Sequence, residues 1–154
     1  MSQLIRKWWP APPDERYWAP HLARFYAENV EYHEMTSGGS KLHHPQVRIL
    51  LDLVQAGGLY AEIGCGGGET AAAVADTATV TGYDASPIAA AKATERYGKS
   101  GARFAVGSAD ALPIPDSAVD GAYSFEVLEH LWDPVAAIVE MSRVTKPGGF
   151  VLVS

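Results

Sequence analysis

Three acidic or glycine-rich segments follow short apolar runs in the middle of this chain. The first reads Glu62-Ile63-Gly64-Cys65-Gly66-Gly67-Gly68-Glu69. Glycines at such a turn permit positive φ and let a ligand approach the backbone closely. Asp84 ends the second apolar run, and Asp110 follows the third. Because a carboxylate placed like Asp84 can accept hydrogen bonds from both hydroxyls of a ribose, the three segments together predict a nucleoside pocket.

The carboxylates beside the glycines distinguish between nucleoside ligands. The dinucleotide fingerprint G-x-G-x-x-G fails from Gly64 because its sixth position is Glu69; from Gly66 it is met only in the weaker form that ends in Ala71. No Lys-Ser or Lys-Thr pair follows the glycines, so the phosphate-loop pattern is absent. Glu62 and Glu69 would repel a pyrophosphate and suit a cation. S-adenosylmethionine, a nucleoside with a sulfonium and no phosphate, therefore fits better than NAD; an NAD-dependent oxidoreductase is the alternative.

Short apolar runs alternate with alanine-rich segments from Leu59 onward. Strands are expected at Leu59–Ile63, Thr79–Tyr83, Ala102–Val106, Val119–Ser124 and Gly149–Ser154. Helices are expected near Glu69–Asp76, Pro87–Tyr97 and Pro134–Val144. This order predicts an α/β fold, a Rossmann-like doubly wound and mostly parallel sheet of five strands with helices on both faces. The three segments then lie at the carboxyl ends of the strands, where such sheets bind ligands.

Capping residues support the predicted helices. Ser86 and Asp133 each precede a proline, so each suits the N-cap of a helix whose first residue is that proline. Gly98 is expected to end the helix that begins at Pro87.

Residues 1–57 differ from the rest of the chain and predict an N-terminal helical cap on a core formed by residues 58–154. Seven of the fifteen aromatic residues lie within the first 32 positions. Pro20 and Pro45 suit the first positions of two helices. An aromatic cluster of this kind most often belongs to a core.

Composition bounds the class of protein. The chain has 154 residues, 47% of them hydrophobic and 19% charged, which fits one globular domain. Its net charge of −6 argues against a nucleic acid or an anionic membrane as the main partner. The single cysteine excludes a disulfide framework and a paired-cysteine zinc site, and no metal is expected. Without an apolar run of about 20 residues or a signal-like start, a cytoplasmic protein is the expectation.

The motifs, taken in order, resemble class I S-adenosylmethionine-dependent methyltransferases. The glycine segment is followed by Gly82-Tyr83-Asp84-Ala85-Ser86-Pro87 and by Ala109-Asp110-Ala111-Leu112-Pro113. The stretch from Val119 to His130 and its continuation Arg143-Val144-Thr145-Lys146-Pro147-Gly148-Gly149 are similar to the small-molecule branch (type 11 domain) that includes quinone-biosynthesis enzymes. The resemblance implies a methyl transfer from S-adenosylmethionine, leaving S-adenosylhomocysteine, to a small-molecule acceptor.

The resemblance also implies roles for individual residues. The methionine part of the cofactor is expected at Glu62, Gly64, Cys65, Gly66 and Gly68, the ribose at Asp84 and Ala85, and the adenine at Ala109, Asp110 and Ala111. Phe125 and Glu126 are expected near the transferred methyl group. Tyr26, with Tyr17 and Tyr32, is a candidate for a lid contact, because an N-terminal helix closes over the cofactor in related enzymes.

A general base is optional, because methyl transfer from a sulfonium mainly needs the acceptor and the methyl group held in line. Glu126, His130 and His33 are candidates, although packing is the simpler interpretation of His130. Cys65 is interpreted as a small residue in a crowded turn rather than a nucleophile. No Asn/Asp-Pro-Pro-Tyr motif follows the fourth expected strand, which disfavours amino-methylation of nucleic acids.

The resemblance implies seven strands, whereas this sequence stops inside the fifth, so strands 6 and 7 are expected to be lacking. We expect the cofactor pocket to form, but we expect this chain alone to transfer the methyl group poorly or not at all. The apolar residues Phe150–Val153 would form a free sheet edge that favours self-association. The alternatives are a fragment, a second subunit that supplies the strands, or a catalytically incompetent cofactor-binding or scaffold protein.

Overall fold

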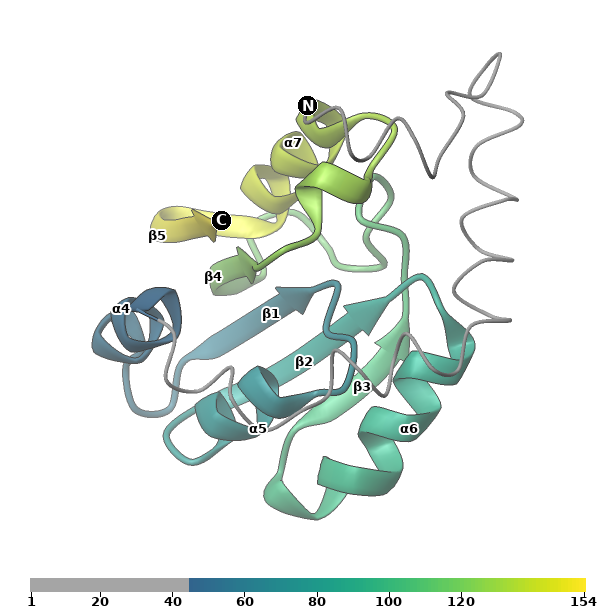
Figure 1. The fold of residues 1–154 in the computed structure, drawn as a ribbon. Helices are drawn as coiled ribbons and strands as arrows, with labels where there is room; N and C mark the ends of the chain where they lie inside the picture. Colours follow the sequence, from purple (N-terminus) through teal and green to yellow (C-terminus); the bar gives the residue numbers. More distant parts are fainter. Residues whose placement is uncertain (1–44) are drawn as a thin grey trace.

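A five-stranded parallel sheet organises residues 45–154, the part of the chain that the computed structural model describes (Figure 1). The strands are β1 Leu59–Ile63, β2 Thr79–Asp84, β3 Arg103–Val106, β4 Val119–Ser124 and β5 Thr145–Val153. They are ordered β3-β2-β1-β4-β5, and every neighbouring pair is parallel. The predicted fold class is confirmed. Most of the expected N-terminal cap, residues 1–44, lies outside the described residues, so the proposed division at residue 57 stays a prediction.

Among residues 45–154, four α-helices and two short 3-10 helices accompany the strands; the first precedes β1, and the others lie between strands. They are α4 Pro45–Leu53, α5 Glu69–Ala75, α6 Pro87–Tyr97, α7 Pro134–Val144, η2 Gly98–Ser100 and η3 Leu128–His130. Both predicted caps are confirmed: Ser86 Oγ accepts a hydrogen bond from the Ala89 N–H (3.3 Å), and Asp133 Oδ1 accepts one from the Ala136 N–H (3.0 Å). Within the described residues, no helix is both long and apolar enough to span a membrane.

The predicted element boundaries were wrong at several ends, most clearly in β5. This strand begins at Thr145, four residues before the predicted start, because Thr145 already pairs with Val119 of β4. The register shifts between Val119 and Gly121, which accommodates a glycine with φ +85° at Gly148. Strand β2 runs one residue longer than predicted, β3 begins one residue later and α5 ends one residue earlier. Helix α6 ends before Gly98 as predicted, but Gly101, not Gly98, takes the left-handed conformation (φ +97°).

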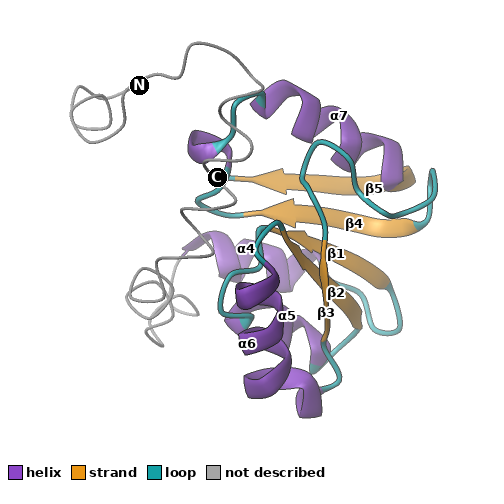
Figure 2. Ribbon diagram, turned by 90° about the vertical axis from the view of Figure 1, so that its right-hand side faces the viewer, coloured by secondary structure: helices purple, strands orange, loops and turns teal. Residues whose placement is uncertain are grey.

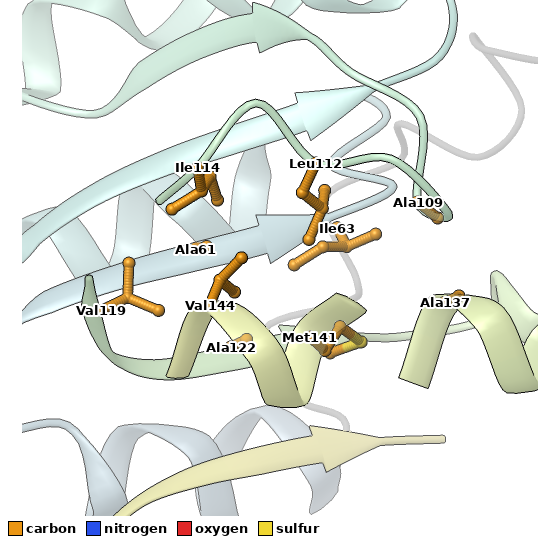
Figure 3. Packing of buried hydrophobic residues seen from close by; sticks show 10 residues of the cluster. All are labelled: Ala61, Ile63, Ala109, Leu112, Ile114, Val119, Ala122, Ala137, Met141 and Val144. Carbon is orange, nitrogen blue, oxygen red and sulfur yellow. The ribbon is translucent and has the colours of Figure 1, made fainter. Parts of the chain in front are cut away.

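Two apolar clusters pack on opposite faces of the sheet. Helices α4 and α5 cover one face with Leu50, Ala71 and Val74, which pack on Tyr60 and Tyr123 of β1 and β4. Helix α6 lies beside α5, while α7 lies across the sheet from them (Figure 2). Figure 3 shows the second cluster, where α7 and the segment before β4 meet Ala61, Ile63 and Ala122. Most of the predicted site residues lie in the segments that directly follow β1, β2, β3 and β4, at the carboxyl ends of these strands.

Candidate active site

The glycine segment after β1 is a turn held by backbone hydrogen bonds. The N–H groups of Gly64 and Cys65 both donate to the Tyr83 carbonyl of β2, at 2.7 and 3.0 Å. A Cβ at Gly64 (φ +76°) would clash with Val127, so this glycine is required for packing. Gly66 (φ +49°) differs, because a Cβ there would meet nothing within 4 Å among the described residues. The turn therefore has open space beside Gly66, and a ligand that binds against the turn would need such space.

Through its carboxylate, Asp84 links the glycine turn to the segment that follows β2. Its Oδ2 accepts a hydrogen bond from the Gly66 N–H (2.9 Å) and its Oδ1 accepts one from the Ser86 N–H (2.8 Å). Its backbone carbonyl accepts from the Gly107 N–H (3.0 Å), which begins the segment after β3. The structure thus brings the segments that follow β1, β2 and β3 together at one residue. The sequence predicted a carboxylate here but not this anchoring, which depends on the pairing of β1 with β2.

Buried carboxylates make the region under the glycines electronegative. Glu62 and Glu69 are 5% and 8% exposed, and Arg96 lies 3.9 Å from Glu69 Oε1. Burial raises the pKa of the Cys65 thiol far above its ordinary value, and the charges of Glu62 and Asp84 raise this pKa further. A thiol held protonated is a poor nucleophile. This agrees with the interpretation of Cys65 as a small residue in a crowded turn.

The segment after β3 carries the residues expected at the adenine. Ala109 is buried, whereas Asp110 and Ala111 are exposed. The Ser108 hydroxyl donates to Asp110 Oδ1, and the Ala111 N–H donates to the Ser108 carbonyl (3.2 Å). Ala85, the neighbour of Asp84, is also exposed. These residues are therefore available to a ligand at the same end of the sheet.

Two candidate catalytic residues follow β4. Glu126 is exposed and adopts φ +56°, a left-handed conformation that costs a non-glycine residue about 1 kcal/mol or more. Its N–H donates to the Ser154 carbonyl (3.1 Å). Phe125 is half-buried, with its ring centroid 5.8 Å from that of Tyr123. His130 lies in the three-residue helix η3 rather than in a full α-helix, and its Nε2 is 3.7 Å from Glu129 Oε1.

Some expected residues are not brought together here. Among residues 45–154, no hydrogen bond or ion pair joins Glu126 to His130. Tyr26, with Tyr17, Tyr32 and His33, lies outside the described residues. In the described part of the chain, no group of three or more His, Cys, Asp or Glu side chains is placed to hold a metal ion.

The geometry fits a cationic nucleoside. The open space at Gly66 gives room for a chain beside the glycine turn, and the buried carboxylate of Glu62 suits a positive charge there. Each oxygen of Asp84 accepts one N–H and keeps a second lone pair for a hydroxyl. These groups lie at the carboxyl ends of β1 and β2, the place where open α/β sheets bind their ligands.

Comparison with known proteins identifies the family. A family model described as "Methyltransferase domain" (type 11) matches residues 61–153, so the chain belongs to this S-adenosylmethionine-dependent methyltransferase family. It is 42% identical over 94 residues to the "Probable S-adenosylmethionine-dependent methyltransferase" of Mycolicibacterium smegmatis, covering 60% of this chain and 36% of that protein. It is 36% identical over 107 residues to the 2-methyl-6-phytyl-1,4-hydroquinone methyltransferase of Synechocystis, covering 68% and 34%.

A solved structure supports the fold. The S-adenosylmethionine-dependent methyltransferase of Aquifex aeolicus superposes with a TM-score of 0.71 at 19% identity, over 80% of this chain and 70% of that one. The chain spans about a third of the length of the two curated relatives.

Proposed function

We propose that this chain binds S-adenosylmethionine across the segments that follow β1, β2 and β3, and that it serves the transfer of a methyl group to a small molecule. The cofactor supplies the methyl group on a positively charged sulfur. The observation that carries the proposal is the hydrogen bond from the Gly66 N–H to Asp84 Oδ2, at 2.9 Å. It places the open side of the glycine turn beside the carboxylate that suits a ribose.

Different residues around this hydrogen bond are proposed to bind different parts of the cofactor. Glu62, with Gly64, Cys65 and Gly68, shapes the end that takes the methionine part. Asp84 and Ala85 take the ribose, and Ala109, Asp110 and Ala111 take the adenine. Phe125 and Glu126 border the acceptor. Tyr26 is proposed to contact the cofactor as part of a lid.

Positioning is the main catalytic contribution that this site offers. Holding acceptor and methyl group in line contributes several kcal/mol to such a displacement. Where the acceptor needs to lose a proton, Glu126 is the proposed base, with His130 as the alternative. The hydroquinone methyltransferase among the relatives supports an aromatic acceptor, which the half-buried Phe125 ring would suit by stacking.

Calorimetric titration of the purified chain tests the proposal against its alternative. S-adenosylhomocysteine should bind at one site, and NAD should not, because the carboxylates near the glycine turn oppose a pyrophosphate. Binding of NAD without binding of S-adenosylhomocysteine would favour an oxidoreductase. Cofactor binding with no methyl transfer to any small acceptor would favour a scaffold.

We also propose that the chain self-associates through β5. This strand is at one edge of the described sheet, and Val151 and Val153 are 36% and 37% exposed. An apolar sheet edge is a template for pairing with another strand. Sedimentation should show dimers at roughly tens of micromolar, a range that suits a small and weak interface, and a Val151→Lys variant should sediment as a monomer. A monomer for both chains would refute self-association.

A further inference from the structure

The twelve-residue segment 107–118, between β3 and β4, carries the proposed adenine-binding residues without a helix or strand of its own. Its regular pairing is limited to an isolated bridge between Ser108 and Ala111. The side chains of Leu112 and Ile114 are buried, at 5% and 9% exposure, in the same apolar cluster as Met141 and Val144 of α7 (Figure 3). Burial of these two side chains keeps the segment against the core. It does not orient the backbone N–H and C=O groups, because the hydrophobic effect is non-directional.

Two side chains of α7 hold the backbone of this segment. Arg143 Nη2 donates to the Leu112 carbonyl (3.2 Å), and Arg143 Nη1 donates to the Ile114 carbonyl (2.9 Å). Glu140 Oε2 accepts from the Leu112 N–H (2.9 Å). The two side chains also bind each other through two parallel hydrogen bonds, of 2.7 and 2.8 Å. The ion pair therefore contacts both backbone polar groups of Leu112, whose carbonyl also accepts from the Ile114 N–H (2.8 Å).

The far end of the segment is held independently. The Ser117 and Ala118 N–H groups donate to the backbone carbonyls of Arg143 and Val144, each at 2.8 Å. These hydrogen bonds join backbone groups only, so they would survive substitution of the Glu140 or Arg143 side chain. The ion pair instead contacts the backbone of the segment at Leu112 and Ile114, and Leu112 directly follows Ala111.

We propose that Glu140 and Arg143 are positioning residues that set the selectivity for adenine by fixing the backbone that carries Asp110 and Ala111. The inference rests on the proposed function. Asp110 presents an exposed carboxylate, which accepts a hydrogen bond from the 6-amino group of adenine and opposes the 6-oxygen of hypoxanthine. A loosened backbone would leave that carboxylate free to shift, and the two bases would become harder to distinguish.

The test compares S-adenosylhomocysteine with S-inosylhomocysteine, which differ in that amino group, by calorimetric titration of the full chain. The parent chain should prefer the adenosyl compound by about tenfold or more, the size expected for a hydrogen bond to a charged group. Arg143→Lys keeps the charge but lacks the planar fork that reaches two carbonyls and Glu140 together, so it should lose most of the preference. Glu140→Gln, a milder change, should lose part of it.

A matched control separates positioning from general electrostatics. Asp116 Oδ1 also accepts from Arg143 Nη1 (2.6 Å), but its side chain is 78% exposed and makes no described hydrogen bond to the Leu112 backbone. Asp116→Asn should retain the parent preference within about twofold. Thermal unfolding of each variant verifies that the fold is intact at the titration temperature.

The outcomes are distinguishable. Failure of the parent chain to bind S-adenosylhomocysteine would overturn the proposed function itself. Normal binding by the parent, with an undiminished preference in a folded Arg143→Lys or Glu140→Gln chain, would overturn only the positioning role. An equal loss in Asp116→Asn would also overturn it, because that result would point to a general charge effect.

Discussion

The two ends of the proposed nucleoside pocket are built in different ways. The glycine turn after β1 is short and held largely by its own neighbours, through the Tyr83 carbonyl and the Asp84 carboxylate of the adjacent strand. The segment 107–118 is long and held from outside, by two side chains of α7 about 30 positions further along. One end therefore depends on the glycine backbone and the neighbouring Asp84 carboxylate, and the other on an ion pair. Different substitutions should therefore impair ligand binding at the two ends.

Gly66→Val should produce the largest effect, because it fills the open side of the turn. We expect affinity for S-adenosylhomocysteine to fall by about 100-fold or more, while the chain remains folded with a cost of about 1–3 kcal/mol for a β-branched residue at positive φ. Calorimetry and urea unfolding measure the two effects. Gly64→Val is the contrast: its side chain would strike Val127, so it should lose folding stability as well as binding. Unchanged affinity in Gly66→Val would mean that the turn has no ligand.

Asp84→Ala should have the next largest effect on binding. Loss of a charged hydrogen-bond acceptor costs about 1.5–3 kcal/mol, and this carboxylate also anchors Gly66. We therefore expect a large loss for S-adenosylhomocysteine and a smaller but measurable loss for its 2′,3′-dideoxy analogue. Equal losses for both ligands would show that Asp84 does not contact the ribose. No loss for the analogue would show that the anchor to Gly66 contributes nothing.

The smallest effect concerns the ion pair on α7 and appears as a dependence of stability on pH. Hydrogen bonding to Arg143 lowers the pKa of Glu140 from 4.5 to about 2. A lowered pKa means that the pair stabilises the folded chain above pH 4.5 and that this contribution fades as the pH falls toward 2. The free energy of unfolding of the parent chain should thus exceed that of Glu140→Gln near neutral pH, and the difference should shrink in acid. If the difference in unfolding free energy between the two chains did not depend on pH, Glu140 would not be the group whose ionisation stabilises the fold.

The sequence predicted the part of the molecule that is encoded locally. Alternating apolar runs and the proline-linked caps at Ser86 and Asp133 indicated the parallel sheet and two of its helices, because such signals act within a few residues. The start of β5 was missed because pairing with β4, across a register shift, extends that strand into Pro147-Gly148-Gly149. No local propensity reports such pairing.

The site shows the same division. The glycine turn and Asp84 were predicted because they directly follow apolar runs, a pattern that is visible within a few residues. The spacing of Glu140 and Arg143, three positions apart on a predicted helix, suggests an ion pair, but nothing local indicates that its partners are the Leu112 and Ile114 backbone. Such contacts follow only from the packing of α7 over the sheet.

Hydrogen exchange with and without S-adenosylhomocysteine tests most directly the claim that one ligand spans both ends of the pocket. We expect slower exchange at the amides of residues 64–68 and of residues 108–112 together, with the second half of α6, residues 92–97, unchanged as an internal reference. Protection of only one of these two segments, or of neither under saturating ligand, would contradict the account.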